Sequence, residues 1–271
     1  MRLTDQHIHS ECSIDSEAPM RDMALAARDR GMAAVCFTDH VEMDDSVTGQ
    51  PAPDWELRWP RILSTYRELM THPPERIEVR LGMELGCPNH FPELADRIAA
   101  APELDFILGS LHNLRATTDF YYYPYTSEDE CARLNRLYLD ELMEIARMDC
   151  FDVMAHIGYT CRYMARAGFR EKIDTDRYGD QLRPLLGLLI SRGKGIEINT
   201  SGMRQGNGPY PGADILTLYR QLGGEIVTLG SDGHVPRDAG AGIAEAAELL
   251  KSLGFRYYAE FERRQPVFRP L

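Results

Sequence analysis

The stretch Asp5-Gln6-His7-Ile8-His9 ends the first short apolar run of the chain, and the pattern that it begins continues through the whole sequence. Six of the eight histidines lie at the ends of such runs, and carboxylates take the corresponding place elsewhere. Mostly apolar runs are typical of parallel strands that are buried on both faces. The other run ends are Thr38-Asp39-His40, Gly82-Met83-Glu84, Gly109-Ser110-Leu111-His112, Met154-Ala155-His156, Glu197-Ile198-Asn199 and Gly230-Ser231-Asp232-Gly233-His234.

Seven predicted strands alternate with predicted helices, which indicates repeated β/α winding. A closed barrel explains why so many strand ends carry polar side chains better than an open sheet does. The strands are expected near Leu3–His9 and over Ala34–Asp39, Ile77–Gly86, Asp105–His112, Asp152–Gly158, Gly195–Ser201 and Glu225–Asp232. The helices are expected over Pro19–Arg30, Leu57–Met70, Pro92–Ala100, Glu128–Arg147, Asp176–Arg192, Ala213–Leu222 and Ile243–Leu253.

Length and composition favour one barrel domain over residues 1–271. The chain has 44% apolar residues, enough to bury a full core, and barrels of this size commonly form a single unit. The first residues lack the pattern of a signal peptide, and the longest apolar stretch, Leu185–Ile190, is too short to span a bilayer. The six cysteines form no Cys-x-x-Cys pair, so reduced thiols are expected. We therefore expect a cytoplasmic protein that binds no membrane.

The net charge of −12 disfavours a broad nucleic-acid surface, because phosphate backbones are bound chiefly by excess lysine and arginine. A small-molecule substrate is the expected partner. Carboxylates gathered around divalent cations would be locally neutralised, so an anionic group on the substrate could still approach.

The polar strand ends predict a polynuclear metal site. His7 and His9 lie two residues apart on a strand, so both can face one metal ion. Taken alone, such a pair is more often a hydrogen-bonded core pair or a surface pair; its recurrence with the other histidines favours metal binding. Glu84 ends an apolar strand, where a carboxylate needs a cation or an arginine partner. Asp232 and His234 repeat the two-residue spacing, and Gly233 allows close backbone approach.

In their order along the chain, these residues resemble the polymerase and histidinol phosphatase (PHP) superfamily, and the resemblance covers nearly the whole sequence. The motifs are Asp5-x-His7-x-His9, Thr38-Asp39-His40, Glu84, Gly109-Ser110-x-His112, His156 and Gly230-Ser231-Asp232-Gly233-His234. Three stretches are similar to the histidinol-phosphatase branch in particular: Ser10 to Ser16, Gly109 to His112 and Ile198 to Arg204. The resemblance implies a distorted (β/α)7 TIM-like barrel of the α/β class with a trinuclear metal centre.

The resemblance also implies a set of metal ligands. His7, His9, Glu84 and Asp232 would hold the first metal ion. Glu84 would bridge to the second, which His112 and His156 complete. The third would be held by Asp15, His40 and His234, although many relatives have histidine in place of Asp15. We therefore expect two to three divalent ions, with zinc favoured and manganese or iron as alternatives.

The resemblance to the histidinol-phosphatase branch implies the hydrolysis of L-histidinol phosphate to L-histidinol and phosphate. Cations can lower the pKa of a water molecule for in-line attack on phosphorus, while a guanidinium absorbs charge on the phosphoryl oxygens. We assign Glu84, His234 and Arg204 as catalytic residues. Arg204 is the first candidate for binding phosphate, and Arg162, just after His156, is the second.

Other polar residues allow more than one interpretation. Asp39 and Asn199 could orient ligands or bond the barrel rim. The Tyr121-Tyr122-Tyr123-Pro124-Tyr125 cluster could form a wall for an imidazole ring or pack in an exposed loop. The cluster of Glu42, Asp44 and Asp45 could meet a cationic amine, but a solvated acidic loop is the simpler interpretation. His72 and His90 are interpreted as surface histidines.

Three alternative functions come from different classes. A PHP phosphoesterase that acts on nucleotides or other small phosphate esters would keep the same metal ligands. A metal-dependent amidohydrolase would commonly place a carboxylated lysine after the fourth strand, whereas this chain has His112 there and only Lys172, Lys194 and Lys251. A scaffold without catalysis would be expected to lose ligands, and every ligand position here is filled.

Overall fold

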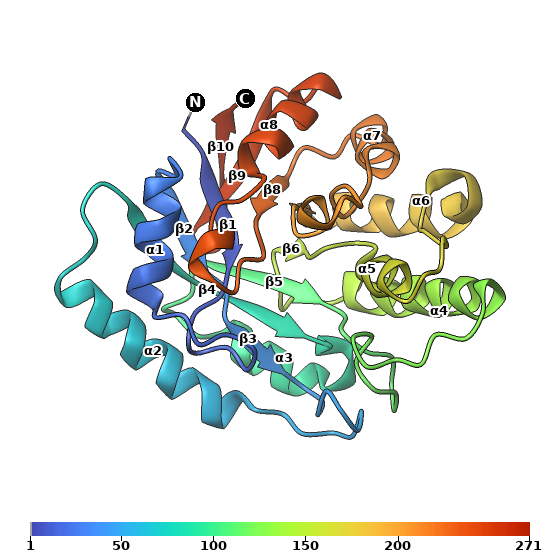
Figure 1. Ribbon diagram of the computed structural model, residues 1–271, viewed down its shortest axis with the longest axis horizontal. Coiled ribbons are helices and arrows are strands. Elements are labelled where there is room, and N and C mark those ends of the chain that lie inside the picture. Colours follow the sequence, from blue (N-terminus) through green and yellow to red (C-terminus); the bar gives the residue numbers. More distant parts are fainter. Residues whose placement is uncertain (1) are drawn as a thin grey trace.

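The computed structural model describes residues 2–271 and shows a nearly closed barrel of parallel strands with helices around it (Figure 1). The strands are β1 (Thr4–Ile8), β2 (Ala34–Phe37), β4 (Glu78–Gly86), β5 (Phe106–Ser110), β6 (Val153–Met154), β7 (Gly195–Asn199) and β8 (Val227–Gly230). They pair in that order. The two ends of the sheet meet just beyond β1 and β8, where Ile8 pairs with Gly233 and the His9 amide donates to Gly233 O at 3.0 Å. The predicted (β/α)7 TIM-like barrel is thus confirmed.

Each predicted helix is present, and its observed ends lie within two residues of the expected ones. The helices are α1 (Met20–Asp29), α2 (Trp55–Thr71), α3 (Pro92–Ala99), α4 (Glu128–Ala146), α6 (Thr175–Ser191), α7 (Ala213–Gln221) and α8 (Ile243–Ser252). The sequence did not predict α5 (Tyr159–Arg166). The start of α4 illustrates the local signals, because Ser127 accepts a hydrogen bond from the Glu130 amide in a Ser-x-x-Glu cap.

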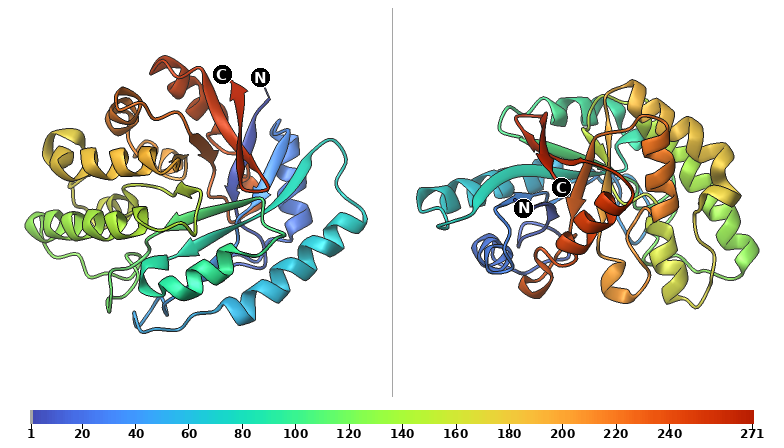
Figure 2. Two further views of the ribbon diagram at one scale, coloured as in Figure 1. Left: turned by 180° about the vertical axis from the view of Figure 1, so that it is seen from behind. Right: turned by 90° about the horizontal axis from the view of Figure 1, so that it is seen from above.

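The helices surround the barrel on its outer side, as the views from behind and from above show (Figure 2). The main core lies between strands and helices, and a smaller buried cluster of Cys36, Phe106, Leu108, Val153 and Ala155 packs with Ala259 and Phe261 near the C-terminus. Within residues 2–271, no helix has both the length and the apolar character that a membrane crossing requires.

A short strand, β3 (His40–Glu42), continues the line of β2 along β4 after a break at Thr38 and Asp39. Its register sets His40 beside Glu84 and Glu42 beside Gly86. The interpretation of Glu42 as part of a solvated loop was therefore wrong. With one apolar residue among three, β3 has no periodic pattern, and its pairing depends on β4.

The C-terminal segment forms an antiparallel hairpin of β9 (Tyr257–Glu262) and β10 (Gln265–Pro270), which the sequence did not predict. Its two turn residues, Arg263 and Arg264, have φ values of 49° and 64°, although such turns usually contain asparagine or glycine. Asp105, just before β5, accepts both of their amide hydrogens at 2.9 and 2.8 Å. The hairpin therefore covers the amino ends of the strands, and this contact stabilises the turn.

We predict that Phe261→Ala lowers the free energy of unfolding by about 3–5 kcal/mol, the usual cost of deleting a buried phenyl ring. Phe261 is 2% exposed and stacks on Phe106 with ring centroids 4.8 Å apart. The matched control is Phe268→Ala on β10, where the side chain is 43% exposed and the cost should stay below about 1 kcal/mol. Urea unfolding followed by circular dichroism measures both. Equal midpoints for the two variants would contradict the placement of Phe261.

Candidate metal centre

All the residues predicted as metal ligands lie together at the carboxyl ends of the strands, where barrel active sites form. Together with both candidate arginines, most of them line a cavity of about 240 Å³. The ligand candidates in its wall are Asp15, His40, Glu84, His112, His156, Asp232 and His234, and the fully buried His7 and His9 lie directly beneath. The polar strand ends of the sequence thus form one site.

Glu84 lies at the centre of this site and is 1% exposed. One carboxylate oxygen is 3.1 Å from His7 Nε2 and 3.2 Å from His40 Nδ1. The other oxygen is 3.1 Å from His112 Nε2 and 2.8 Å from His156 Nε2. Burial alone would raise the pKa of Glu84, but the neighbouring imidazoles outweigh burial and hold that pKa well below its usual value. A carboxylate with ligand groups on both oxygens suits a bridging role between two cations.

His7, His9 and Asp232 form a first group of donor atoms that lie within 4.8 Å of one another. The two Nε2 atoms of His7 and His9 are only 3.0 Å apart, and His9 Nε2 is 3.5 Å from Asp232 Oδ1. Burial and the nearby His234 and His40 lower the pKa of His9 to about 3, which keeps its ring neutral and able to coordinate. Nitrogen and oxygen lone pairs that converge in this way fit a divalent cation such as zinc.

A second group of donor atoms, again within 4.8 Å of one another, comes from His40, Glu84 and His112. Burial alone would lower the pKa of His40, but Glu84 and Asp15 raise it to about 10. Carboxylates thus hold a proton on this ring, in a place where a cation would satisfy the same negative charge.

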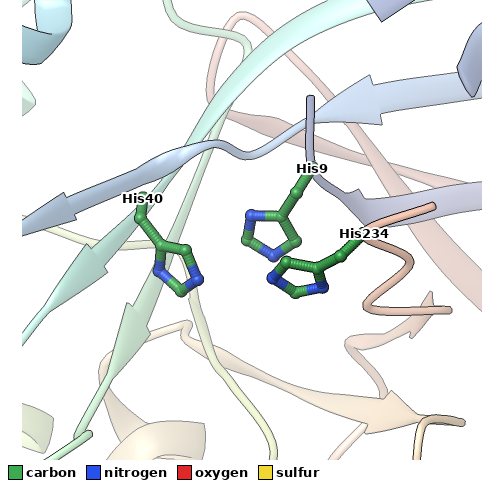
Figure 3. A group of neighbouring side chains, drawn as sticks. All are labelled: His9, His40 and His234. Atoms are coloured by element: carbon green, nitrogen blue, oxygen red, sulfur yellow. The ribbon is translucent and has the colours of Figure 1, made fainter. Parts of the chain in front are cut away.

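The third group joins Asp15, His40 and His234. His234 Nε2 is 3.1 Å from Asp15 Oδ2, and His40 Nε2 is 3.7 Å from Asp15 Oδ1. Figure 3 shows the rings of His9, His40 and His234 drawn together from three segments, and their donor atoms also lie within 4.8 Å of one another. His9 therefore lies between the first group and the third.

Most of these histidines are oriented by a hydrogen bond from Nδ1, which leaves Nε2 free to coordinate. His7 donates to Glu197 at 2.6 Å, His9 to Ser13 at 2.9 Å and His112 to Glu42 at 2.9 Å. The sequence assigned no such role to Glu197, Ser13 or Glu42. For the two carboxylates, the feature of the sequence that could have indicated this role is a glycine in the neighbouring strand, which leaves space for the carboxylate. A Cβ on Gly86 would lie 1.9 Å from Glu42 Oε2, and one on Gly230 would lie 2.1 Å from Glu197 Oε1.

Asp39 and Asn199, whose roles the sequence left open, both act behind the histidines. Asp39 accepts hydrogen bonds from Ser10 and from the Ser13 hydroxyl that meets His9. Asn199 donates to Glu197 at 3.1 Å. Both residues thus hold side chains that orient proposed ligands.

The two candidate arginines both line the cavity and both contact Asp232, but they differ in how many donors they have free. Arg204 donates to the backbone oxygens of Ser231 and Asp232 at 2.6 and 3.2 Å. Arg162 makes longer contacts of 3.4 Å with Ser201 and Asp232. Arg162 therefore has more donor capacity left for an anion.

A second cavity of about 500 Å³ adjoins the metal centre and shares with the first the residues Asp15, His40, His112, Tyr121, Tyr159 and Tyr163. Carboxylates and tyrosine rings form most of the rest of its wall, together with Ile14, Ser46, Ala52 and Arg58. The Tyr cluster contributes Tyr121 and Tyr122, which are also about half exposed. These wall residues include Glu42, Asp44, Asp45, Asp54, Asp119, Tyr121, Tyr122, Tyr159 and Tyr163.

The two remaining histidines behave differently. His72 is exposed, as predicted. The interpretation of His90 as a surface residue was wrong, because its side chain is 4% exposed and lies between Asp44 and Glu141. Its place in a short turn suggested exposure, whereas α4 packs over that turn.

The family model described as PHP domain matches residues 5–201, and the chain belongs to this family. A histidinol-phosphatase of Lactococcus lactis is 26% identical over 267 residues, which cover 96% of this chain and 95% of the relative. A probable histidinol-phosphatase of Thermotoga maritima is 28% identical, with 95% of each chain covered. A solved structure of histidinol phosphate phosphatase from Lactococcus lactis, complexed with Zn, L-histidinol and phosphate, has a TM-score of 0.80 and 25% identity to this chain. That match covers 98% of this chain and 99% of the other.

We predict that Glu42→Gln weakens the binding of divalent metal by about 10–100-fold, the usual effect of removing a carboxylate that orients ligating histidines. Glu42 Oε1 is 2.9 Å from Nδ1 of both His40 and His112, so one substitution affects two proposed ligands. Zinc competition with a chromophoric chelator measures the change. Glu248→Gln, an exposed carboxylate on α8, is the control and should bind like the wild type. Unchanged affinity in the Glu42 variant would remove this role.

Proposed function

We propose that this protein is a metal-dependent phosphomonoesterase that hydrolyses L-histidinol phosphate to L-histidinol and phosphate. One observation carries the proposal: a full set of nitrogen and oxygen ligands around Glu84 adjoins both a pair of guanidinium groups and an acidic, aromatic cavity. Histidinol-phosphatases that align along nearly the whole chain support the substrate.

The donor set fits two or three divalent cations, which we propose to be zinc. Imidazole and carboxylate ligands suit zinc and also accept manganese or iron. His7, His9, Glu84 and Asp232 would hold the first ion, Glu84, His112 and His156 the second, and Asp15, His40 and His234 the third. When bound, such ions supply an activated water nucleophile and positive charge for the phosphoryl oxygens.

The residues of this chain would orient the phosphoryl group. Arg162 and Arg204 line the same cavity as Glu84 and His112, so their N–H groups can hold two phosphoryl oxygens there. Guanidinium groups already in place stabilise the charge that develops on these oxygens during transfer. The Arg204 bonds to Ser231 and Asp232 also keep the loop that carries His234 in place.

The alcohol part of the substrate would occupy the second cavity. L-Histidinol carries an ammonium group and an imidazole ring, and this cavity offers carboxylates such as Glu42 and Asp119 beside the rings of Tyr121 and Tyr159. Opposite charges and stacking surfaces favour such a group. A nucleotide would bring no ammonium group to pair with these carboxylates, which favours histidinol phosphate over a nucleotide ester.

The amidohydrolase alternative has less support. The walls of both cavities described here contain no lysine. Lys194 lies at the other end of the barrel, just before β7, and donates to Asp149 O at 3.1 Å. His112 follows the fourth strand of the barrel order, in the place that a carboxylated lysine would take.

We predict that the zinc-reconstituted protein releases phosphate from L-histidinol phosphate with a kcat/KM at least about 100-fold above that for nucleoside monophosphates, small phosphodiesters or an aryl phosphate. The measurement is phosphate release with each substrate, before and after chelation. Chelation should abolish turnover. Preference for a nucleotide would keep the metal site but change the substrate, and inactivity toward every ester in fully loaded protein would refute the phosphatase.

We predict that Arg162→Ala lowers kcat/KM for the phosphate ester by about 100-fold, the usual effect of losing one charged donor to a transition-state oxygen. The bound zinc should stay unchanged, since Arg162 contacts Asp232 only at 3.4 Å. Arg170→Ala, an exposed arginine four residues after the end of α5, is the matched control and should keep full activity. If both variants keep wild-type kcat/KM, Arg162 does not bind the phosphoryl group.

A further inference from the structure

A second group of potential metal ligands lies outside the centre described above. The donor atoms of Asp44, Cys87 and His90 are within 4.8 Å of one another. Asp44 follows β3, while Cys87 precedes and His90 ends a short 3-10 turn, η1 (Pro88–His90), after β4. All three side chains are inaccessible: Cys87 is fully buried, and those of Asp44 and His90 are 5% and 4% exposed.

The ring of His90 is held so that each of its nitrogens faces a carboxylate. Its Nε2 donates to Glu141 of α4 at 2.9 Å, as in the carboxylate and histidine pairs that orient metal ligands. Its Nδ1 then points at Asp44 Oδ2. A neutral ring in this arrangement turns a lone pair toward an anion, so a cation must lie between the two atoms, either a proton or a metal ion.

Cys87 and Asn113 complete the surroundings of that position. Cys87 has a φ of 52°, and the His90 amide donates to Cys87 O at 2.9 Å, so this Cys-x-x-His turn directs both side chains to one side. Asn113 Oδ1 is 3.2 Å from Cys87 Sγ, and Asn113 Nδ2 donates to Asp44 Oδ2 at 3.0 Å. Thiol, imidazole, carboxylate and amide oxygen groups thus meet in one buried place.

We propose that Asp44, Cys87 and His90 form an additional cation site, with Asn113 Oδ1 as the fourth donor. A thiolate with an imidazole and oxygen ligands selects zinc or a cation of similar softness over magnesium or calcium. Four protein ligands leave no open position, so the site is structural rather than catalytic. Its ligands are distinct from those of the metal centre around Glu84, so its test does not depend on the proposed reaction.

The site would fix one wall of the second cavity. Asp44 lies in that wall beside Asp45, and a cation would bind the loop after β3 to the turn after β4. Glu141 extends the connection to α4. The bound ion would thus set the position of the acidic groups that adjoin the catalytic centre.

Cobalt(II) tests the site directly, because a thiolate bound to cobalt gives intense near-ultraviolet charge-transfer absorption and the centre around Glu84 contains no cysteine. The full-length wild-type protein, stripped of metal and then titrated with Co²⁺, should show this band. Cys87→Ser should lose the band and bind one equivalent fewer. Cys150→Ser, at a cysteine that is also buried but belongs to none of the ligand groups found within residues 2–271, is the matched control and should keep both.

His90→Gln supplies a second variant, with His72→Gln as its control at an exposed histidine. The His90 variant should bind one equivalent fewer than its control. Absence of the thiolate band from fully loaded wild-type protein would overturn the proposal without reference to any variant, and would leave His90 as an imidazolium between Asp44 and Glu141. Equal cobalt stoichiometry in the wild type and the Cys87 variant would also overturn it.

Discussion

The buried carboxylate of Glu84 is the constraint on which the site depends. A carboxylate that is 1% exposed must have positive charge or donors around it, and here four imidazoles approach its two oxygens. Those imidazoles come from four different segments of the barrel. A shift of one of these strands against its neighbour would therefore remove a partner of Glu84, so the polar centre and the barrel register support each other.

Glycines in neighbouring strands make room for a second layer of carboxylates behind the histidines. Glu42 and Glu197 reach across neighbouring strands, and Gly86 and Gly230 leave the space that they occupy. Each carboxylate fixes the tautomer of a histidine before any ligand binds. The barrel thus supplies both the imidazoles and the groups that aim them, which reduces the reorganisation that metal binding requires.

The sequence predicts much of this protein, and its failures share a physical cause. Apolar runs and the helical spacing of apolar residues show which residues of one element are buried. The seven barrel strands, seven of the helices and the proposed ligands at strand ends could therefore be predicted from the sequence. Glu42 and His90 depend on contacts between elements, with β4 and α4 respectively. The hairpin turn at Arg263-Arg264 likewise depends on Asp105, because neither arginine favours a positive φ. A pattern within one segment cannot report such contacts.

The distribution of charge explains how a chain of net charge −12 can receive an anion. Arg162 and Arg204 lie on one side of the metal centre, whereas the carboxylates of Glu42, Asp45 and Asp119 gather in the adjoining cavity. This separation of charge favours one orientation for a molecule with an anionic phosphate and a cationic amine that binds across the two regions. Reversal would place phosphate among carboxylates at a cost of several kcal/mol. The orientation of such a molecule thus follows from where the arginines and carboxylates lie. Short contacts then need only fix the position of its phosphorus atom.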